Sequence, residues 1–424
     1  MLELSYIREH PEVVRENLRK RQVPEYLVLL DTVLKNDELW RGLKTKLDAA
    51  RARRNKISQD INAAKKSGND ASALIKEAAD IPKVIAQAEK ELTELEAKLR
   101  NCLFQLPNIV HESVPYGKDD TENVVVKTVG KKPSFKFTPL SHVDLLVKND
   151  WADLDRAAKI SGARWYFLKG DLALLEMSLV RYAMEFMNEK GFTPVIPPFM
   201  MSHKAYEGVV SLEDFENVMY KIQAEDLYAI ATSEHPLTAM YMDEVLDDSS
   251  LPIKMAGYST NFRKEAGAHG KDQKGIFRVH QFNKVEQIVL CKPEDSWHFH
   301  EELLKNAVEF FDSLGLHLRV VNVCTGDLGI IAAKKYDVEA WYPVQNAFRE
   351  VVSCSNCTSY QSVRSNIRFQ HGNERHYVHT LNSTCVADTR ALVAILENFQ
   401  REDGSVDVPK VLQKYTGFKI LKKR

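Results

Sequence analysis

The sequence has few cysteines and no long apolar run. Six cysteines are spread over 424 residues, a usage that fits a reducing compartment better than a disulfide framework. No apolar stretch approaches the length that spans a membrane, and the first segment, MLELSYIREH, lacks the apolar core of a signal peptide. We therefore predict a cytoplasmic location and no membrane partner.

The chain also lacks an excess of either charge. Its formal net charge is -1 at pH 7, so no global basic field predicts a nucleic-acid partner, although a local patch still can. Its 44% hydrophobic and 28% charged residues are typical of a globular protein with room for two or three domains. Cys354 and Cys357 form a lone CxxC motif without a second ligand pair, so we predict two buried thiols and no zinc.

Residues 1–105 carry a helical pattern. Apolar side chains repeat in steps of three and four from Trp40 to Ala64 and again from Leu74 to Cys102, which predicts a coiled coil. The KKSGND segment between the two runs is short, so the helices must fold back antiparallel. We predict a helical domain over residues 1–105 whose hairpin, about residues 38–103, extends roughly 45 Å at 1.5 Å per residue.

The two helices of this hairpin differ in charge. The first, Arg41 to Lys66, has nine Lys or Arg residues and two acids, whereas the second, Asp70 to Arg100, has five bases and seven acids. Such a basic stripe is typical of a solvated flank, of a helix paired against an acidic partner, or of a surface that follows nucleic-acid phosphates. The charge pattern alone leaves these alternatives open.

The periodicity changes beyond the hairpin. Residues 106–120 hold two prolines and one glycine, and we predict that they form a linker. Over residues 121–424, short apolar runs such as Asn123–Val129 and His317–Val323 alternate with helical stretches such as Asp171–Lys190 and Val386–Gln400. Because the spacing is not that of regular βαβ units, we predict an α+β domain with an antiparallel or mixed sheet flanked by helices.

One polar segment of this second domain is FRKEAGAHGKDQKGIFRVHQFNKVEQ, residues 262–287. Arg263 and Glu265 are predicted to share one face of a strand, as are Phe282 and Glu286, about 13 Å apart on the return strand. That spacing suits a ligand with a planar apolar group at one end and a cation at the other. Three glycines lie in the basic loop between the strands and are predicted to make it flexible.

Three further polar segments are ambiguous when taken singly. ATSEHPLT, residues 231–238, precedes a predicted helix, and a plain helix cap is the favoured interpretation. AFREVVSCSN, residues 347–356, is typical of a strand with ordinary polar residues. In HTLNSTCVADTRALVAILENFQ, residues 379–400, Arg390 lies near the start of a predicted helix. A cation there is disfavoured unless an anion compensates it, although a surface arginine is the simpler alternative.

Together these segments resemble those of the seryl-tRNA synthetases, a family of class II aminoacyl-tRNA synthetases. GFTPVIPPFM, residues 191–200, resembles motif 1; the 262–287 stretch resembles motif 2; and ADTRALVAILENFQ, residues 387–400, resembles motif 3. The basic hairpin resembles the tRNA-binding arm of the family, and the resemblance covers essentially the whole chain. It implies an antiparallel catalytic sheet flanked by helices and a homodimer formed through motif 1.

The resemblance implies a serine–tRNA ligase that uses ATP and Mg²⁺. Serine and ATP would give seryl-adenylate, and the seryl group would pass to tRNA(Ser) and, where it is present, to tRNA(Sec). The residues implied in catalysis are Arg263, Glu350 and Arg390. The implied serine pocket is of the metal-free type and comprises Thr232, Ser233, Glu234, Arg263, Glu286, Asn382 and Thr384.

The nucleotide and tRNA sites of the family also map onto these segments. Glu350 and Ser353 are implied as ligands of a Mg²⁺ ion that bridges the phosphates of ATP. The ATP-binding residues implied are Arg263, Lys264, Glu265, Phe282, Glu350, Val351, Val352, Ser353 and Arg390. The tRNA-binding residues expected on the arm and on the motif 2 loop are Lys44, Lys46, Arg51, Arg53, Lys56 and Lys271.

One departure from the wider class II pattern is that Cys385 and Ala387 occupy glycine positions of motif 3. Two rival functions share parts of this resemblance. The first is an amino acid:carrier-protein ligase of the same fold, against which the long arm argues. The second is a non-catalytic RNA-binding paralogue, against which the presence of every charged motif residue argues.

Overall fold

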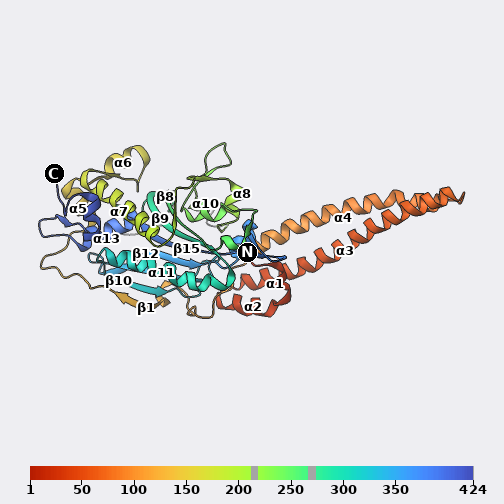
Figure 1. Cartoon of the computed structure of the whole chain (residues 1–424), viewed down its shortest axis with the longest axis horizontal. Coiled ribbons are helices and arrows are strands. Elements are labelled where there is room, and N and C mark those ends of the chain that lie inside the picture. The colour runs from red at the N-terminus through yellow and green to blue at the C-terminus, as the bar shows by residue number, and fades with distance from the viewer. Residues whose placement is uncertain (212–217, 266–273, 424) are drawn as a thin grey trace. The chain divides into compact units, whose positions relative to one another are not determined.

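The computed structural model describes residues 1–211, 218–265 and 274–423 (Figure 1). The chain divides into two compact units, one formed by Leu2–Pro107 and the other by Met1 together with Asn108–Arg424. The motif 2 loop residue Lys271, for which the family resemblance implies a tRNA contact, lies outside the described residues. Within the described ranges, no helix is both long and apolar enough to cross a bilayer.

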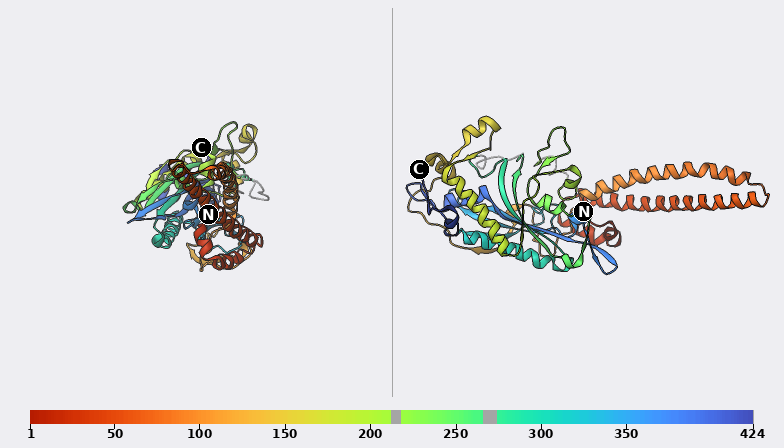
Figure 2. Two further views of the ribbon diagram at one scale, coloured as in Figure 1. Left: turned by 90° about the vertical axis from the view of Figure 1, so that its right-hand side faces the viewer. Right: turned by 45° about the horizontal axis from the view of Figure 1, so that its top comes forward.

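The smaller unit is an antiparallel helical hairpin on a short helical base (Figure 2). The predicted coiled coil is confirmed, because Leu47, Ile57, Ile85 and Leu92 are buried along the line where the two long helices meet. Arg54, which falls on the three-and-four spacing between Ala50 and Ile57, is exposed. The first long helix begins well before the predicted hairpin and runs unbroken for 42 residues. The helices are α1 Leu4–Glu9, α2 Pro11–Lys20, α3 Glu25–Lys66 and α4 Ser72–Gln105.

The basic stripe of α3 is partly matched by the acids of α4. Arg51 NH2 lies 2.8 Å from Glu89 Oε1, and Arg53 NH2 lies 2.7 Å from Glu77 Oε2. Both pairs join one helix to the other, so the predicted pairing against an acidic helix accounts for part of the charge. Lys46 and Lys56 are exposed on α3 and have no ion pair within the described chain.

A buried carboxylate joins the base of the arm to the first helix. The Asp37 side chain is 2% exposed and accepts hydrogen bonds from Arg8 Nε at 3.0 Å and from Arg41 Nε at 3.0 Å. Burial by itself raises the pKa of Asp37, but Arg8 and Arg41 hold that pKa below its usual value. We expect Asp37→Asn to lower the unfolding free energy of the smaller unit by about 2 kcal/mol, because two arginines lose their anion.

Hydrogen exchange over α1, α2 and the first turns of α3 would measure this loss in the full chain. The matched control is Asp31→Asn, which removes the exposed pair of Asp31 with Arg15, where NH2 and Oδ1 are 2.7 Å apart. We expect that control to change the opening free energy by less than about 1 kcal/mol. If hydrogen-exchange protection over these helices were the same in Asp37→Asn and Asp31→Asn, Asp37 would have no structural role beyond that of an exposed ion pair.

An eight-stranded sheet forms the centre of the larger unit, in the order β1-β10-β11-β12-β15-β9-β8-β4. Every neighbouring pair is antiparallel except β4 and β8, which are parallel. The predicted α+β class with an antiparallel sheet is therefore confirmed. The strands are β1 Val124–Val129, β4 Thr193–Val195, β8 Ile253–Phe262, β9 Gln281–Cys291, β10 Leu318–Asn322, β11 Lys334–Tyr342, β12 Ala347–Asn356 and β15 His379–Ala387.

Three helices share a core with one face of this sheet. Val285 and Val289 of β9 lie in the same buried cluster as apolar residues of these helices. Because side chains alternate along a strand, Lys284 and Glu286, on either side of Val285, face the other side. The helices are α7 Gly170–Glu189, α11 Ser296–Ser313 and α13 Asp388–Asn398.

Shorter elements surround the sheet and complete the larger unit. Two of them, α10 and α12, bear on the site described below. The shorter elements are α5 His142–Asn149, β2 Ala152–Asp153, α6 Leu154–Ser161, β3 Phe167–Leu168, β5 Met200–Met201, α8 His203–Glu207, β6 Tyr228–Ala229, α10 Glu234–Ala239, β7 Val245–Asp247, α12 Tyr360–Ser365, β13 Arg368–His371, β14 Glu374–Tyr377, β16 Val406–Asp407, α14 Gln413–Thr416 and β17 Ile420–Leu421.

The predicted elements at 123–129, 317–323 and 171–190 correspond to β1, β10 and α7. The predicted start of the motif 3 helix was wrong, because Val386 and Ala387 pair with Val285 and Lys284 and so extend β15. Most of the stretch predicted as a linker packs on the larger unit. Val110, in this stretch, shares a buried apolar cluster with Val323. This packing holds in place a segment for which the prolines had predicted only a loop.

Candidate active site

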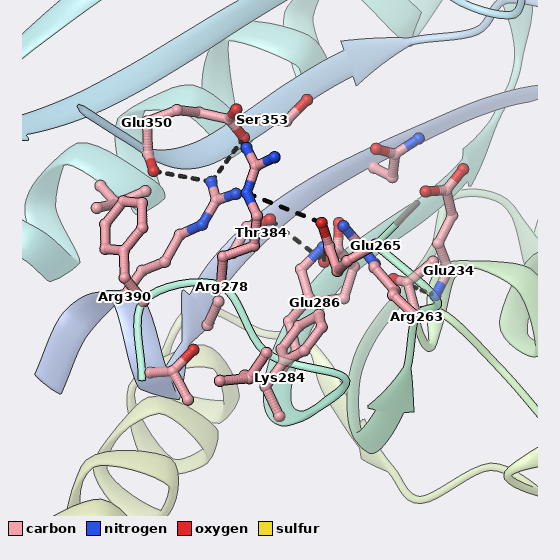
Figure 3. Close-up of a pocket in the computed structure, with 18 residues that line it drawn as sticks. Glu234, Arg263, Glu265, Arg278, Lys284, Glu286, Glu350, Ser353, Thr384 and Arg390 are labelled. Carbon is pink, nitrogen blue, oxygen red and sulfur yellow. Dashed lines mark hydrogen bonds and ion pairs between the residues drawn. The ribbon is translucent and has the colours of Figure 1, made fainter. Parts of the chain in front are cut away.

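A cavity of about 260 Å³ opens on the face of the sheet that carries Lys284 and Glu286 (Figure 3). Strands β9, β12 and β15 form its floor, and the first turns of α10 and α13 contribute to its walls. Segments 263–265 and 277–279 complete it. The lining residues are Thr232, Glu234, Arg263, Glu265, Phe277, Arg278, Val279, Phe282, Lys284, Glu286, Glu350, Val351, Ser353, Asn382, Thr384, Ala387, Thr389 and Arg390.

One side of the cavity carries two guanidinium groups beside two carboxylates. Figure 3 shows Arg278, Arg390 and Glu350 gathered there, with Glu234 on the opposite side. Arg390 NH1 donates to the Glu350 carbonyl at 2.8 Å and lies 3.3 Å from its carboxylate, while Arg278 Nε lies 3.8 Å from Glu265 Oε2. Burial raises the pKa of Glu350, but Arg390 and Lys335 more than offset it, so that the pKa is lowered. Glu350 is therefore an ionised carboxylate beside fixed cations.

A third guanidinium lies between the two sides of the cavity. Arg263 Nε donates to the Ala231 carbonyl at 3.2 Å, and its guanidinium carbon is 5.1 Å from the ring centroid of Phe282. Burial lowers the pKa of Arg263, yet an arginine stays charged at physiological pH. A planar cation held against an aromatic ring can bind two anions at once, one on each edge.

The other side of the cavity holds two carboxylates, Glu286, which is buried, and Glu234, which is half-buried. Glu286 is 1% exposed, forms an ion pair with Lys284, and accepts a hydrogen bond from Thr384 Oγ1 at 3.4 Å. Glu234 Oε1 accepts one from Gln361 Nε2 at 3.0 Å. Burial, with repulsion from Glu286, raises the pKa of Glu234 to about 7, and burial also raises the pKa of Glu286. The carboxylates of Glu234 and Glu286 have one lysine, Lys284, beside them in the cavity lining. They can therefore accept hydrogen bonds from a ligand that carries both a positive charge and a hydroxyl group.

The predicted strand geometry around Arg263 was wrong. Strand β8 ends at Phe262, and Glu265 adopts a left-handed backbone with φ 48°. Arg164 holds this turn from outside the cavity, because its NH1 donates to the Glu265 carbonyl at 2.9 Å. The backbone N–H of Arg263 donates to the His280 carbonyl at 2.9 Å. Arg263 and Glu265 still line the same cavity, as predicted, but a turn and not strand alternation brings them there.

Twelve of the predicted serine and ATP residues line the cavity. Three do not. The Ser233 hydroxyl is buried and donates to the Gly257 carbonyl at 2.9 Å, while Val352 lies in the apolar core on the other side of β12. Lys264 lies in the turn after β8, outside the lining set. The twelve are Thr232, Glu234, Arg263, Glu265, Phe282, Glu286, Glu350, Val351, Ser353, Asn382, Thr384 and Arg390.

Several lining residues were not assigned to the site from the sequence. Lys284 lies between Phe282 and Glu286 on β9, so the alternation that paired those two residues also predicts it. Arg278 belongs to the irregular segment that precedes β9, where no periodicity applies. The others in this group are Phe277, Val279, Ala387 and Thr389.

The two cysteines of the CxxC motif are buried in the larger unit. Burial raises the pKa of both Cys354 and Cys357, which keeps them as thiols. Asn382 Nδ2 donates to Cys357 Sγ at 3.7 Å, so this thiol packs beneath a residue of the predicted serine pocket. Within the described ranges, no group of three or more His, Cys, Asp or Glu side chains is arranged to hold a metal ion.

Comparison with known proteins places this geometry in a family. The seryl-tRNA synthetase N-terminal domain model matches residues 1–110, and the tRNA synthetase class II core domain (G, H, P, S and T) model matches residues 218–399. A serine–tRNA ligase of Methanocorpusculum labreanum is 56% identical over 418 residues, covering 98% of each chain. The chain belongs to the seryl-tRNA synthetases. The synthetase is also 51% identical to the serine–tRNA ligase of Thermococcus sibiricus, over 99% of this chain and 97% of the other.

Solved structures of the family have the same fold as this synthetase. The seryl-tRNA synthetase of Pyrococcus horikoshii, complexed with ATP, matches with a TM-score of 0.96 and 48% identity over 100% of both chains. The cytoplasmic enzyme of Naegleria fowleri, in complex with AMP, matches with a TM-score of 0.90 and 37% identity over 100% of this chain and 99% of the other. The synthetase is therefore an aminoacyl-tRNA ligase that uses ATP.

Proposed function

We propose that the cavity binds serine and ATP together, forms seryl-adenylate, and then transfers the seryl group to tRNA(Ser). The observation that carries this proposal is the division of one cavity into a guanidinium side and a carboxylate side, with Arg263 close enough to interact with the charges of Arg390 and Glu350 of the first and Glu286 of the second. Phosphates suit the first side and a serine ammonium and hydroxyl suit the second. The extension to tRNA(Sec) stays a prediction.

Arg263 is the residue we assign to the reacting atoms. One edge of its guanidinium would hold the serine carboxylate and the other the α-phosphate, which brings a carboxylate oxygen in line with phosphorus. As that oxygen bonds to phosphorus, the bond to the bridging oxygen of diphosphate breaks and diphosphate leaves. Arg278 and Arg390 would neutralise the charge that builds up on the departing phosphates.

Phe282 and Arg390 are assigned to opposite faces of the adenine ring, and Glu265 to its amino group. Phe282 lines the cavity beside Arg263, whose guanidinium carbon is 5.1 Å from its ring centroid, and an aromatic ring there can stack on a planar base. In the transfer step, the terminal adenosine hydroxyl of the tRNA would attack the seryl carbonyl and release AMP.

Mg²⁺ fits Glu350 and Ser353, which are oxygen donors that line the guanidinium side. The lowered pKa of Glu350 keeps it ionised, as a ligand of a hard cation must be. Two protein ligands suit a Mg²⁺ ion bound mainly through phosphate oxygens, whose positive charge would help to neutralise the phosphates.

The serine pocket is assigned to the carboxylate side. Thr232, Asn382, Thr384 and the two glutamates present buried polar atoms that a serine hydroxyl and ammonium would satisfy. Alanine would leave some of those atoms unpaired, which makes it a poor substrate. Lys284 would keep Glu286 ionised beside the ligand.

Serine use should depend steeply on pH, because the pKa of Glu234 is raised to about 7 by burial and by Glu286. The carboxylate is needed as an anion, so protonation of the free enzyme below pH 7 removes the ammonium anchor. We expect kcat/KM for serine at pH 6 to be about tenfold below its plateau. An ordinary glutamate would lose its charge only near pH 4.5.

Pyrophosphate exchange measured from pH 5.5 to 8.5 at saturating ATP gives this profile. Glu234→Gln is the control, with low kcat/KM for serine at every pH and no step near pH 7. A wild-type profile that is flat down to pH 5.5 would contradict the assignment of Glu234 to the ammonium.

We further propose that the arm contacts tRNA and that motif 1 forms a homodimer. Lys46 and Lys56 are exposed cations on α3, suited to RNA phosphates rather than bases. Motif 1 presents large apolar side chains to solvent, with Ile196 71% and Met200 46% exposed. Such a patch is typical of a subunit interface.

The experiment that tests the function is serine-dependent ATP–pyrophosphate exchange followed by charging of serine tRNA. Exchange and charging together support the ligase. Exchange without charging would favour the carrier-protein ligase, and the absence of serine-dependent exchange would contradict both enzymes. The location stays a sequence-based prediction of the cytoplasm.

A further inference from the structure

Gln361 contacts the predicted serine pocket from outside its lining. It lies on α12, and its side chain is 1% exposed. Its Nε2 donates to Glu234 Oε1 at 3.0 Å and to the Val209 carbonyl at 3.1 Å, and its Oε1 accepts from Thr380 Oγ1 at 2.6 Å. Both amide donors and the amide acceptor are therefore used, with no solvent to replace any partner.

These partners fix which way the amide faces. The Val209 carbonyl can only accept, so the nitrogen must point toward it, and the oxygen must then face the Thr380 hydroxyl. The second N–H of the same nitrogen is left for Glu234. Because the amide cannot turn over without losing two hydrogen bonds, Glu234 Oε1 is held by a fixed donor and Glu234 Oε2 is left for a ligand.

Thr380 connects this contact to the strand that carries the rest of the pocket. Thr380, Asn382 and Thr384 are two residues apart along β15 and so lie on one face. Thr380 is 1% exposed, and its backbone N–H donates to the Thr358 carbonyl at 2.9 Å. The chain of contacts from β15 through Thr380 and Gln361 to Glu234 ties the two walls of the pocket together.

We propose that Gln361 is a positioning residue that makes the pocket selective for serine over threonine. Glu234 has Glu286 as a like-charged neighbour, and we expect this repulsion to move the Glu234 side chain if the Gln361 donor is removed. If the Glu234 carboxylate moves, the pocket gains room for the extra methyl group of threonine. The carboxylate oxygens are then also misplaced for a hydrogen bond from the ammonium of the amino acid. The proposal rests on the proposed function, since it takes the carboxylate side of the cavity to hold serine.

Gln361→Leu tests this proposal in the full chain, because leucine keeps most of the volume and removes both donors. In pyrophosphate exchange we expect KM for serine to rise about tenfold. We expect the preference for serine over threonine in kcat/KM to fall about tenfold, and KM for ATP to stay within about twofold. Ser362→Ala is the matched control on α12. Its hydroxyl donates to the Val378 carbonyl at 2.6 Å and does not touch Glu234, so selectivity should be unchanged.

Thr380→Val is a second variant that removes the hydrogen bond to Gln361 Oε1, and so loosens the amide, without altering Gln361 itself. We expect it to weaken serine binding and selectivity in the same direction, and it decides the question if Gln361→Leu does not fold. Unchanged selectivity in the folded variants, or equal losses for serine and ATP, would show that Gln361 only supports α12. A wild-type enzyme without serine-dependent exchange would instead overturn the proposed function, before any variant is compared.

Discussion

Arg263→Ala is expected to abolish adenylate formation while leaving the protein folded. In the proposed function the Arg263 guanidinium holds both the serine carboxylate and the α-phosphate, so its loss removes charge neutralisation and alignment together. We expect serine-dependent pyrophosphate exchange to fall by at least about 1,000-fold. Thermal unfolding of the variant, followed by circular dichroism, should remain a single transition close to that of the wild type.

Arg263→Lys and Arg375→Ala provide controls for this result. Lysine keeps the charge but cannot bind two planar anions at once, so we expect it to recover little activity. Arg375, on β14, is exposed and bonds to Gln370 outside the cavity, so its removal should leave exchange unchanged. Near-normal exchange by Arg263→Ala would refute the role given to this residue.

Deleting residues 44–95 and closing the gap with a short turn is expected to spare exchange and to reduce tRNA charging by at least about a hundredfold. Leu43 and Glu96 can be joined, because Trp40 Nε1 donates to Glu96 Oε1 at 3.0 Å and the two helices lie side by side there. The deletion removes the phosphate-facing cations of α3 and leaves every cavity residue in place. Charging measured over a range of tRNA concentrations would show the loss.

A charge reversal separates the role of the cations from that of the rod. Lys46→Glu with Lys56→Glu should raise KM for tRNA and weaken its salt dependence, because two phosphate contacts are lost. The same reversal at Lys76 and Lys90 of α4 changes the net charge equally and should have little effect. Unimpaired charging by the deletion variant would remove the function assigned to the arm.

The sequence predicts those parts of the fold in which apolar residues recur at a regular spacing along the chain. The buried seam from Leu47 to Leu92 repeats every three and four residues, and solvent exclusion between two helices requires that repeat. On β9, alternation alone puts Phe282 and Glu286 on one face. The identity of the larger set of cavity residues came from resemblance to a family, since residues from five separate segments converge there and no local pattern links them.

The parts that the sequence does not predict depend on contacts between distant segments. Glu265 reaches the cavity through a left-handed turn held by Arg164, which lies about a hundred residues earlier in the chain. Gln361 and Glu234 are separated by 127 positions, so no spacing rule joins them. Ser233 and Val352 adjoin site residues in sequence, but backbone direction turns their side chains into the interior.

The unbroken course of α3 has a mechanical consequence. Glu25 and Lys66 belong to one helix of 42 residues, so the arm has no joint where it leaves its base. A force applied at the Lys66 end of α3 is therefore transmitted along the helix to Asp37 and its partners Arg8 and Arg41, because no flexible loop interrupts it. The smaller unit should therefore turn as a single lever, and distance probes placed at the tip and on α2 should report the same separation in every state of the enzyme.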